Sequence, residues 1–356
     1  MLGYGVSPFT LKATMIRCAG LLTACSLLIA AVSPAFAADP PRQVHDDTGK
    51  TVTVPGQVRH IADAWYAHHS LLMTLGAGGN IVATVNHPES RPWMFRLQPS
   101  LRNALSVHGI TFNSETLLAR KTDVVFVPAG NADAAAYRQA HIPTLEMRFT
   151  DYPSLKKSML TTAAVLGTPE AAARAQAYNA YLDEQLAQTT RRTASLPAAQ
   201  RPRVLHIASL HPLKVDGSGT LIDQWIQAAG GRNAAASIKG NLHEISPEMI
   251  LAWQPDIIIL GADAGSLAAS DDAPIFNALK AVQKNRVYRN PAGVFPWDRY
   301  GTEAALQIPW AAKLLHPDLF PNIDMPGMTQ DFYQRFFDYP LSNTEAARIL
   351  KGLGPV

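Results

Sequence analysis

The sequence is poor in cysteine and in charge, and both shortages limit what the protein can be. Its 356 residues include only 2 cysteines, Cys18 and Cys25. The chain after residue 25 can therefore form no disulfide, no thiolate metal site and no cysteine nucleophile. Charged residues make up 17% of the chain, below the usual quarter, whereas 47% are hydrophobic. This apolar content excludes a largely disordered protein.

Basic runs and membrane-length apolar runs are also absent. The formal net charge is +3, but two of the 31 basic residues, Lys12 and Arg17, lie in the first 37 residues, which contain no acid. The remaining 29 basic and 28 acidic residues nearly balance, so we expect no nucleic-acid partner. The apolar run 18–32 is too short for a comfortable membrane span.

The N-terminus has the layout of an export signal. Lys12 and Arg17 precede the apolar run 18–32, and Ala35-Phe36-Ala37 then supplies the small residues that signal peptidase requires. We predict cleavage after Ala37 and a periplasmic protein. The alternative is a lipoprotein anchored at Cys25, which ends the box Leu22-Thr23-Ala24-Cys25.

The motifs of common enzyme classes are missing as well. Ser218 lies in Asp216-Gly217-Ser218-Gly219, which lacks the Gly-x-Ser-x-Gly elbow of hydrolases. Neither His-Glu-x-x-His nor a P-loop occurs. The glycine-rich segment 76–79 precedes a strand pattern and not a helix that could hold a dinucleotide. We predict a protein that is not an enzyme, with an exported hydrolase as the alternative from a different class.

What the sequence does contain is a repeated alternation of strand and helix patterns. Asp123 begins a buried strand pattern eight residues after Glu115, and Asp256 begins another eight residues after Glu248. Both glutamates lie in the first turn of a predicted helix, behind a Ser or Asn cap. Strands that alternate with helices form parallel sheets, so the repeat predicts two similar α/β lobes.

A long helical stretch separates the two lobes. No Pro or Gly interrupts residues 170–195, and a helix of 25 residues spans roughly 38 Å. We expect a stiff connection. The predicted organisation is a signal peptide at 1–37, an N-terminal lobe at 38–151, connecting helices at 152–196, a C-terminal lobe at 197–312 and a helical tail at 313–356.

Six short segments occur in a characteristic order along the chain. They are Asp47-Thr48-Gly49-Lys50-Thr51-Val52, Leu75-Gly76-Ala77, Asn113-Ser114-Glu115, Gly230-Gly231-Arg232-Asn233, Ile245-Ser246-Pro247-Glu248 and Trp253-Gln254-Pro255-Asp256. Together with the long helix they resemble the periplasmic substrate-binding proteins of ABC importers for iron complexes, cobalamin and haem. The resemblance covers nearly the whole chain after the leader.

This resemblance implies two Rossmann-like lobes joined by one rigid α-helix, with the ligand in the cleft between them and little hinge motion. It also implies that one glutamate on each lobe meets arginines of the membrane permease. The matching positions are Glu115 and Glu248. Exposed carboxylates at these positions would set the register of docking more than its affinity.

Ligands of open α/β sheets bind beyond the carboxyl ends of the strands. The segments that follow the predicted strands are rich in tryptophan, tyrosine, histidine and arginine. The candidate ligand-binding residues are Trp65, Tyr66, His68, His69, Arg91, Trp93, Arg96, His211, His243, Trp297 and Arg299.

These residue types suit a bulky ligand that is anionic or carries a metal. Arginines can pair with carboxylates, tryptophans can stack on flat ligands, and neutral imidazoles can bind a metal. The candidate metal ligands are His68, His69 and His211. Adjacent residues on a helix point about 100° apart, so at most one of His68 and His69 is expected to face the ligand.

The leading prediction is a binding protein for a metal chelate, foremost a ferric siderophore or other iron complex. No intrinsic cofactor is expected, because the metal would arrive within the ligand. The predicted partner is an ABC permease dimer, and the protein is predicted to be a monomer. A nickel or other transition-metal complex bound through histidines, haem, cobalamin and an oxyanion remain as alternatives.

Overall fold

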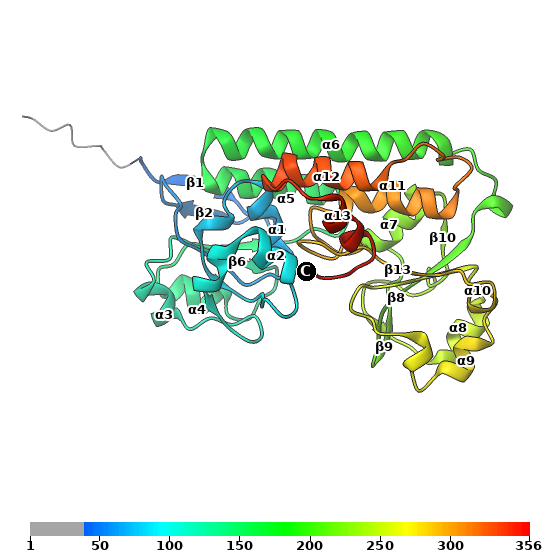
Figure 1. Cartoon of the computed structure of the whole chain (residues 1–356). Coiled ribbons are helices and arrows are strands. Elements are labelled where there is room, and N and C mark those ends of the chain that lie inside the picture. The colour runs from blue at the N-terminus through cyan, green and yellow to red at the C-terminus, as the bar shows by residue number, and fades with distance from the viewer. Residues whose placement is uncertain (1–38) are drawn as a thin grey trace, which may run out of the picture. The chain divides into compact units, whose positions relative to one another are not determined.

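Two parallel sheets organise the structure, a computed structural model that describes residues 39–356 (Figure 1). Both sheets belong to one compact unit of the chain. Within this described range, no helix combines the length and the hydropathy needed to cross a membrane. The predicted signal peptide, its cleavage after Ala37 and the alternative anchor at Cys25 lie outside the described residues.

The N-terminal lobe contains a five-stranded parallel sheet in the order β5-β4-β3-β6-β7. β6 is a continuous apolar run that is fully buried along Val124–Val127, as expected for a strand covered on both faces. An antiparallel pair, β1 and β2, precedes the sheet. The strands of this lobe are β1 (Arg42–His45), β2 (Thr51–Val54), β3 (Ile61–Asp63), β4 (Ile81–Thr84), β5 (Leu105–Ser106), β6 (Val124–Pro128) and β7 (Thr144–Met147).

The C-terminal lobe repeats this plan around a second sheet. Its path is β11-β9-β8-β12-β13, and the short strand β10 pairs with β8. β8, β12 and β13 are parallel, whereas β9, near one edge, pairs antiparallel with both β8 and β11. The strands are β8 (Arg203–Leu210), β9 (Leu213–Val215), β10 (Arg232–Asn233), β11 (His243–Glu244), β12 (Ile257–Leu260) and β13 (Val287–Arg289).

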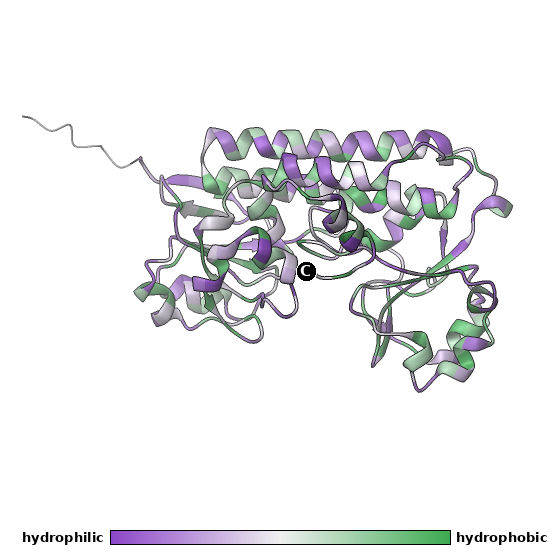
Figure 2. Ribbon diagram, in the orientation of Figure 1, coloured by the Kyte–Doolittle hydropathy of each residue, from purple (hydrophilic) through white to green (hydrophobic). Residues whose placement is uncertain are grey.

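A layer of helices joins the lobes. The layer includes α5 (Tyr152–Leu166) and α6 (Pro169–Thr193), which follow each other between the two sheets. Thr168 caps the N-terminus of α6. The buried side chains of α6 recur every three or four residues, so they form one face, which packs against α5 and α11. Figure 2 shows the resulting mixture of hydrophilic and hydrophobic residues along α6.

The remaining helices cover the sheets and complete the layer. The α-helices are α1 (His68–Thr74), α2 (Pro92–Leu97), α3 (Ser114–Ala119), α4 (Ala134–Gln139), α7 (Leu221–Ala228), α8 (Pro247–Trp253), α9 (Ala273–Asn277), α10 (Lys280–Gln283), α11 (Ala304–Leu315), α12 (Met325–Phe337) and α13 (Asn343–Leu350). The 3₁₀ helices are η1 (Gly78–Asn80), η2 (Pro99–Asn103), η3 (Ala198–Gln200) and η4 (Leu267–Ala269).

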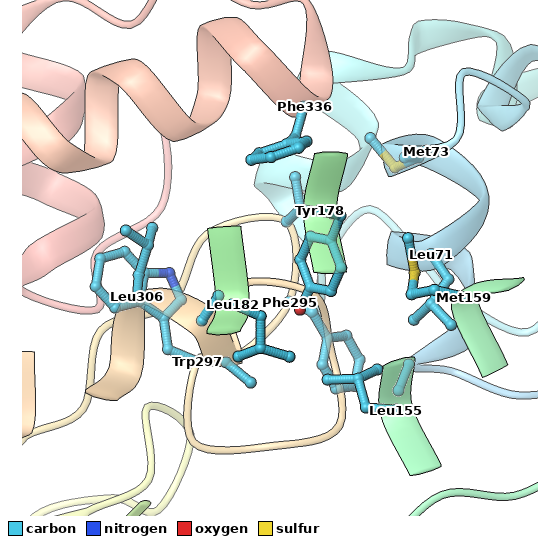
Figure 3. Packing of buried hydrophobic residues seen from close by; sticks show 14 of the residues in the cluster. Leu71, Met73, Leu155, Met159, Tyr178, Leu182, Phe295, Trp297, Leu306 and Phe336 are labelled. Carbon is cyan, nitrogen blue, oxygen red and sulfur yellow. The ribbon is translucent and has the colours of Figure 1, made fainter. Parts of the chain in front are cut away.

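One hydrophobic cluster runs from the N-terminal lobe through the helical layer into the C-terminal lobe. Figure 3 shows side chains from α1, α5, α6, α11 and α12 packed around the loop that carries Phe295 and Trp297. Close-packed interiors resist deformation, so a core shared in this way opposes large hinge motions. The predicted class, two α/β lobes joined by a long helix, is confirmed.

Candidate functional site between the lobes

The carboxyl ends of the two sheets face one another. Arg91 follows β4 and its Nη1 lies 3.0 Å from Oδ2 of Asp263, which follows β12. Phe149 follows β7, and its ring centroid lies 5.8 Å from that of Tyr300, on the segment after β13. Since ligands of open α/β sheets bind at this end of the strands, the surface between the lobes is the candidate site.

A pocket of about 390 Å³ opens between the lobes beside Arg91. Its volume lies within the range that small-molecule sites occupy. The guanidinium of Arg91 also stacks over the ring of Phe295, 5.0 Å from its centroid. The pocket is lined by Glu89, Ser90, Arg91, Pro92, Trp93, Asp263, Ala292, Gly293, Pro296, Gly352, Leu353 and Gly354.

The histidines of the N-terminal lobe form a buried cluster around Asp63. His68 Nδ1 lies 2.9 Å from Asp63 Oδ2, and its Nε2 lies 2.9 Å from the Thr162 hydroxyl. His69 Nδ1 lies 3.1 Å from the Trp65 carbonyl oxygen, and its Nε2 lies 2.7 Å from the Thr84 hydroxyl. Both rings are fully buried. All four ring nitrogens thus have partners in the lobe or on α5, and burial lowers the pKa of His69 despite the nearby carboxylate of Asp63.

The C-terminal lobe contains a second buried cluster, here called the charge tetrad: His206, Asp216, Asp298 and Arg299. His206 Nδ1 lies 2.8 Å from Asp216 Oδ2, and its Nε2 lies 2.6 Å from Asp298 Oδ2. Arg299 Nη1 donates to Asp216 Oδ1 at 3.0 Å. The two carboxylates and His206 are almost completely shielded from solvent.

Burial and ion pairing oppose each other in the tetrad. Burial lowers the pKa of His206, but its hydrogen bonds to Asp216 and Asp298 outweigh this and raise it. Burial likewise raises the pKa of Asp216, whereas His206 and Arg299 hold it well below its usual range. These opposed effects favour the charged forms of His206 and Asp216, each of which stabilises the other.

Two of the predicted tryptophans lie in the core. The indole of Trp93 donates to the carbonyl oxygen of Leu353 at 2.8 Å, and that of Trp297 donates to Glu303 at 3.1 Å. Both side chains are buried, so neither offers a free ring face between the lobes. Their contribution is to hold the segments that carry Arg91 and Arg299.

Glu303 anchors the loop that precedes α11. It accepts hydrogen bonds from the backbone of Val294 and Phe295 and from Trp297 and Tyr333. Burial raises the pKa of this carboxyl to about 7 against the effect of these donors. A side chain at Gly293 would collide with Glu303 and Tyr333, which explains the glycine there.

Four further predicted residues lie outside these clusters. Tyr66 is 40% exposed, and Arg96 is exposed beside Tyr339 and Glu345. His211 is exposed before the cis peptide to Pro212, and exposed His243 has its Nε2 2.6 Å from the Lys239 carbonyl oxygen. The structure does not bring His68, His69 and His211 together as one metal site. In the range 39–356 no three His, Asp or Glu side chains are arranged to hold a metal ion.

Trp65 is the predicted aromatic residue that does reach the surface between the lobes. It is only partly buried, and its ring centroid lies 5.0 Å from that of Phe149. In the C-terminal lobe, the amide of Asn241 donates to the hydroxyl of Tyr300. Trp65 and Tyr300, both partly buried, therefore pack against the buried ring of Phe149 where the two lobes meet.

Glu115 and Glu248 are both exposed near the N-termini of α3 and α8. The hydroxyl of Ser246 and the backbone N–H of Glu248 lower the pKa of Glu248, so this carboxylate is charged at neutral pH. The two helices belong to different lobes (Figure 1).

Sequence reasoning passed over several residues that the fold places here. Asp63 is the last residue of a strand, and Asp216 directly follows one, positions where a polar side chain could have drawn attention. Asp263 and Phe149 follow strands β12 and β7 in the same way. The signal was their position in the sheet and not their residue type.

Comparison with known proteins identifies the family. Residues 66–293, more than half of the chain, match the family model described as periplasmic binding protein. The chain belongs to this family. Its members include the binding proteins of ABC importers, so the predicted family is confirmed.

Individual relatives cover nearly the whole chain. The molybdate-binding protein MolA of Haemophilus influenzae is 26% identical over 91% of this chain and 99% of its own length. Its molybdate-bound structure has a TM-score of 0.75 at 23% identity, covering 85% of this chain and 99% of that one. A periplasmic solute-binding protein of Veillonella parvula has a TM-score of 0.75 at 26% identity, with 87% and 97% covered. Helicobacter pylori CeuE with Ni(II) bound reaches 0.70 at 19% identity, with 87% and 99% covered.

Proposed function

We propose that this chain is the substrate-binding component of an ABC importer and that its cargo is a small oxyanion of the molybdate class. The observation that carries the proposal is a contrast between two residue types. Arg91 and Arg299 place guanidinium groups at the carboxyl ends of the facing sheets, where ligands bind. His68 and His69, the first candidates for holding a metal, are fully buried and hydrogen-bonded within their own lobe.

Guanidinium groups suit oxyanions because they offer several N–H donors in a fixed plane. The partners of the two arginines differ. Arg91 pairs with Asp263, whose side chain is 70% exposed, and such an exposed pair is worth little and is easily exchanged for a ligand. Arg299 is held by a buried carboxylate, which fixes its position. The full-length similarity to MolA of H. influenzae supports the same class of cargo.

A metal chelate, such as a ferric siderophore, is the second candidate. The partly buried rings of Trp65 and Tyr300 favour it, because flat or hydrophobic ligands stack on such rings. The pocket of about 390 Å³ is also larger than a tetrahedral oxyanion requires. Haem, cobalamin and a nickel complex belong to the same class of ligand, because the metal is enclosed in an organic molecule.

Delivery would follow the usual route of the family. We propose export through the leader 1–37, binding of the anion in the periplasm and transfer to a permease. Glu115 and Glu248, exposed on different lobes, would pair with basic residues of that permease. Replacing both with glutamine should abolish stimulation of the reconstituted transporter without changing cargo affinity.

The cargo can be identified by titrating the purified protein with a ligand panel while following tryptophan fluorescence. The panel contains molybdate, tungstate, sulfate, a ferric hydroxamate, haemin, cobalamin and nickel with histidine. We expect saturable binding of molybdate and tungstate, weakened about ten-fold in Arg91→Gln, as the loss of one charge-assisted hydrogen bond predicts. Arg191→Gln, an exposed position on α6, serves as the matched control. A response to a chelate alone would replace the oxyanion with the second candidate.

A further inference from the structure

We infer that His206 is a positioning residue for the anionic cargo: it offsets the tetrad's carboxylates and leaves the guanidinium of Arg299 available to the ligand. This inference rests on the proposed function. His206 lies within β8, fully buried, and makes no contact with the pocket beside Arg91. Its effect on the ligand would pass through Asp216 and Arg299.

The geometry favours a proton on each ring nitrogen of His206. Ionised carboxylates only accept hydrogen bonds, and each nitrogen of the ring faces one carboxylate oxygen, at 2.8 Å and 2.6 Å. The raised pKa of His206 agrees with this arrangement. The edge of the Trp225 ring closes the side of the imidazole, at a centroid distance of 6.1 Å.

The imidazolium determines the net charge of the tetrad. Asp216 and Asp298 supply two negative charges, and His206 and Arg299 supply two positive ones. If His206 were neutral, Arg299 alone would face two carboxylates and the cluster would have a net charge of −1. In a poorly solvated interior, one such charge acts strongly over several ångströms.

Arg299 transmits this balance to the surface between the lobes. A guanidinium has five N–H donors, and among the residues that the structure describes only its Nη1 donates, to Asp216. Its side chain is 17% exposed, and the next residue, Tyr300, contacts Phe149 of the other lobe. The backbone N–H of Leu242 also donates to Asp216 Oδ1 at 3.0 Å, which fixes the carboxylate that holds Arg299.

A series of charge variants tests the inference through molybdate affinity at low ionic strength. His206→Gln gives the tetrad a net charge of −1 and should weaken molybdate binding on the order of ten-fold, whereas Asp298→Asn gives +1 and should strengthen it by a similar factor. The double variant restores neutrality and should return the affinity to near the wild-type value. Damage to the fold would instead weaken binding in all three proteins.

Asp256→Asn is the matched control, since Asp256 is an exposed carboxylate at the opposite end of the C-terminal sheet, where it accepts from the backbone N–H of Arg203. Its affinity should stay within about two-fold of the wild type because exposed charges are screened. If His206→Gln does not fold, Asp298→Asn and ¹⁵N NMR of the wild-type ring at pH 7.5 still test the inference. Two protonated ring nitrogens in the wild type, together with tighter molybdate binding by Asp298→Asn, would support the inference.

The contrary outcomes separate the two proposals. If wild-type protein binds molybdate but the variants show no opposed shifts, the role of His206 is refuted and the proposed function stands. A neutral imidazole in the NMR spectrum has the same consequence. If wild-type protein binds no oxyanion at all, both the proposed function and the role of His206 are overturned.

Discussion

The two lobes each bury a cluster of histidine and aspartate beside the carboxyl end of a central strand, but the histidines of the two clusters have different hydrogen-bond partners. Around Asp63 in the N-terminal lobe, the ring nitrogens of His68 and His69 end on threonine hydroxyls and a backbone carbonyl. In the C-terminal lobe, His206 lies between two carboxylates, one of which holds Arg299. The same residue types thus end on uncharged groups in one lobe and on a charged arginine in the other.

This contrast explains why residue type alone misleads here. A histidine pair after a strand is typical of a metal site, yet both rings of the N-terminal pair are consumed by local hydrogen bonds. His206, within β8, is not among the candidate ligand residues of the sequence, yet it lies at the centre of the charged cluster. The two clusters differ in the group at the end of each chain of hydrogen bonds, which is a hydroxyl or a carbonyl in one lobe and a guanidinium in the other.

The largest expected effect is on the stability of the N-terminal cluster. Asp63→Ala removes a fully buried carboxylate that faces both His68 and His69 and accepts from the backbone of Trp65. We expect a loss of about 3–5 kcal/mol in the free energy of unfolding, measured by urea denaturation, because the partners stay buried and unpaired. Asp183→Ala, at the exposed pair with Lys156, should cost at most about 1 kcal/mol. Equal losses in the free energy of unfolding in the two variants would contradict the structural role assigned to the N-terminal cluster.

The next effect concerns Glu303, a buried carboxylate outside both clusters. Its pKa in the folded protein is about 7 against an ordinary value of 4.5, so the neutral form is favoured by folding. The contribution of Glu303 to the free energy of unfolding should therefore be fully present below pH 4.5 and fall by about 3 kcal/mol as the pH rises to 7, by linkage at 1.36 kcal/mol per pKa unit. Glu303→Gln should lack this part of the pH dependence in thermal melts. An unchanged profile in the variant would assign the slope to other groups.

A smaller effect is expected at the exposed ion pair between the lobes. Asp263→Asn frees Arg91 from its only acidic partner among residues 39–356 while leaving the charge tetrad intact. Molybdate affinity should rise about two- to five-fold, in line with the worth of an exposed pair. Asp271→Asn, on the following exposed segment, is a control that should change nothing. A fall in affinity would indicate that Asp263 itself contacts the cargo.

The smallest effect should come from metal removal. His211 and His243 are exposed and lie apart from the buried clusters, so a metal chelator is expected to leave molybdate affinity unchanged. His211→Ala should behave in the same way. Isothermal titration with and without EDTA measures this directly, and a loss of binding on chelation would restore the histidine interpretation.

The fold could be predicted because its signals are local. The apolar run at Val124–Val127, the repeat of Glu115 and Glu248, and the uninterrupted helix at Pro169–Thr193 each follow from sequence periodicity. The arrangement of the site could not be read in the same way. The pairing of Arg299 with Asp216 joins residues 83 positions apart, and nothing in the order of the chain indicates it. The adjacent Asp298 turns instead to His206.

The tryptophans illustrate the same limit. Trp65 and Trp297 both follow strands, but only Trp65 contributes to the surface between the lobes. Trp297 turns into the core because the buried carboxylate of Glu303 accepts its indole N–H. That carboxylate lies six residues further along the chain, at the start of α11, and its burial depends on the packing of α12.

The most direct test of the account is to crystallise the protein with molybdate and locate the molybdenum by anomalous scattering. The account predicts one strong peak between the lobes, with the oxyanion within hydrogen-bonding distance of the guanidinium of Arg299 or Arg91. A peak outside this surface, or one coordinated by the ring nitrogens of His211 or His243, would contradict it.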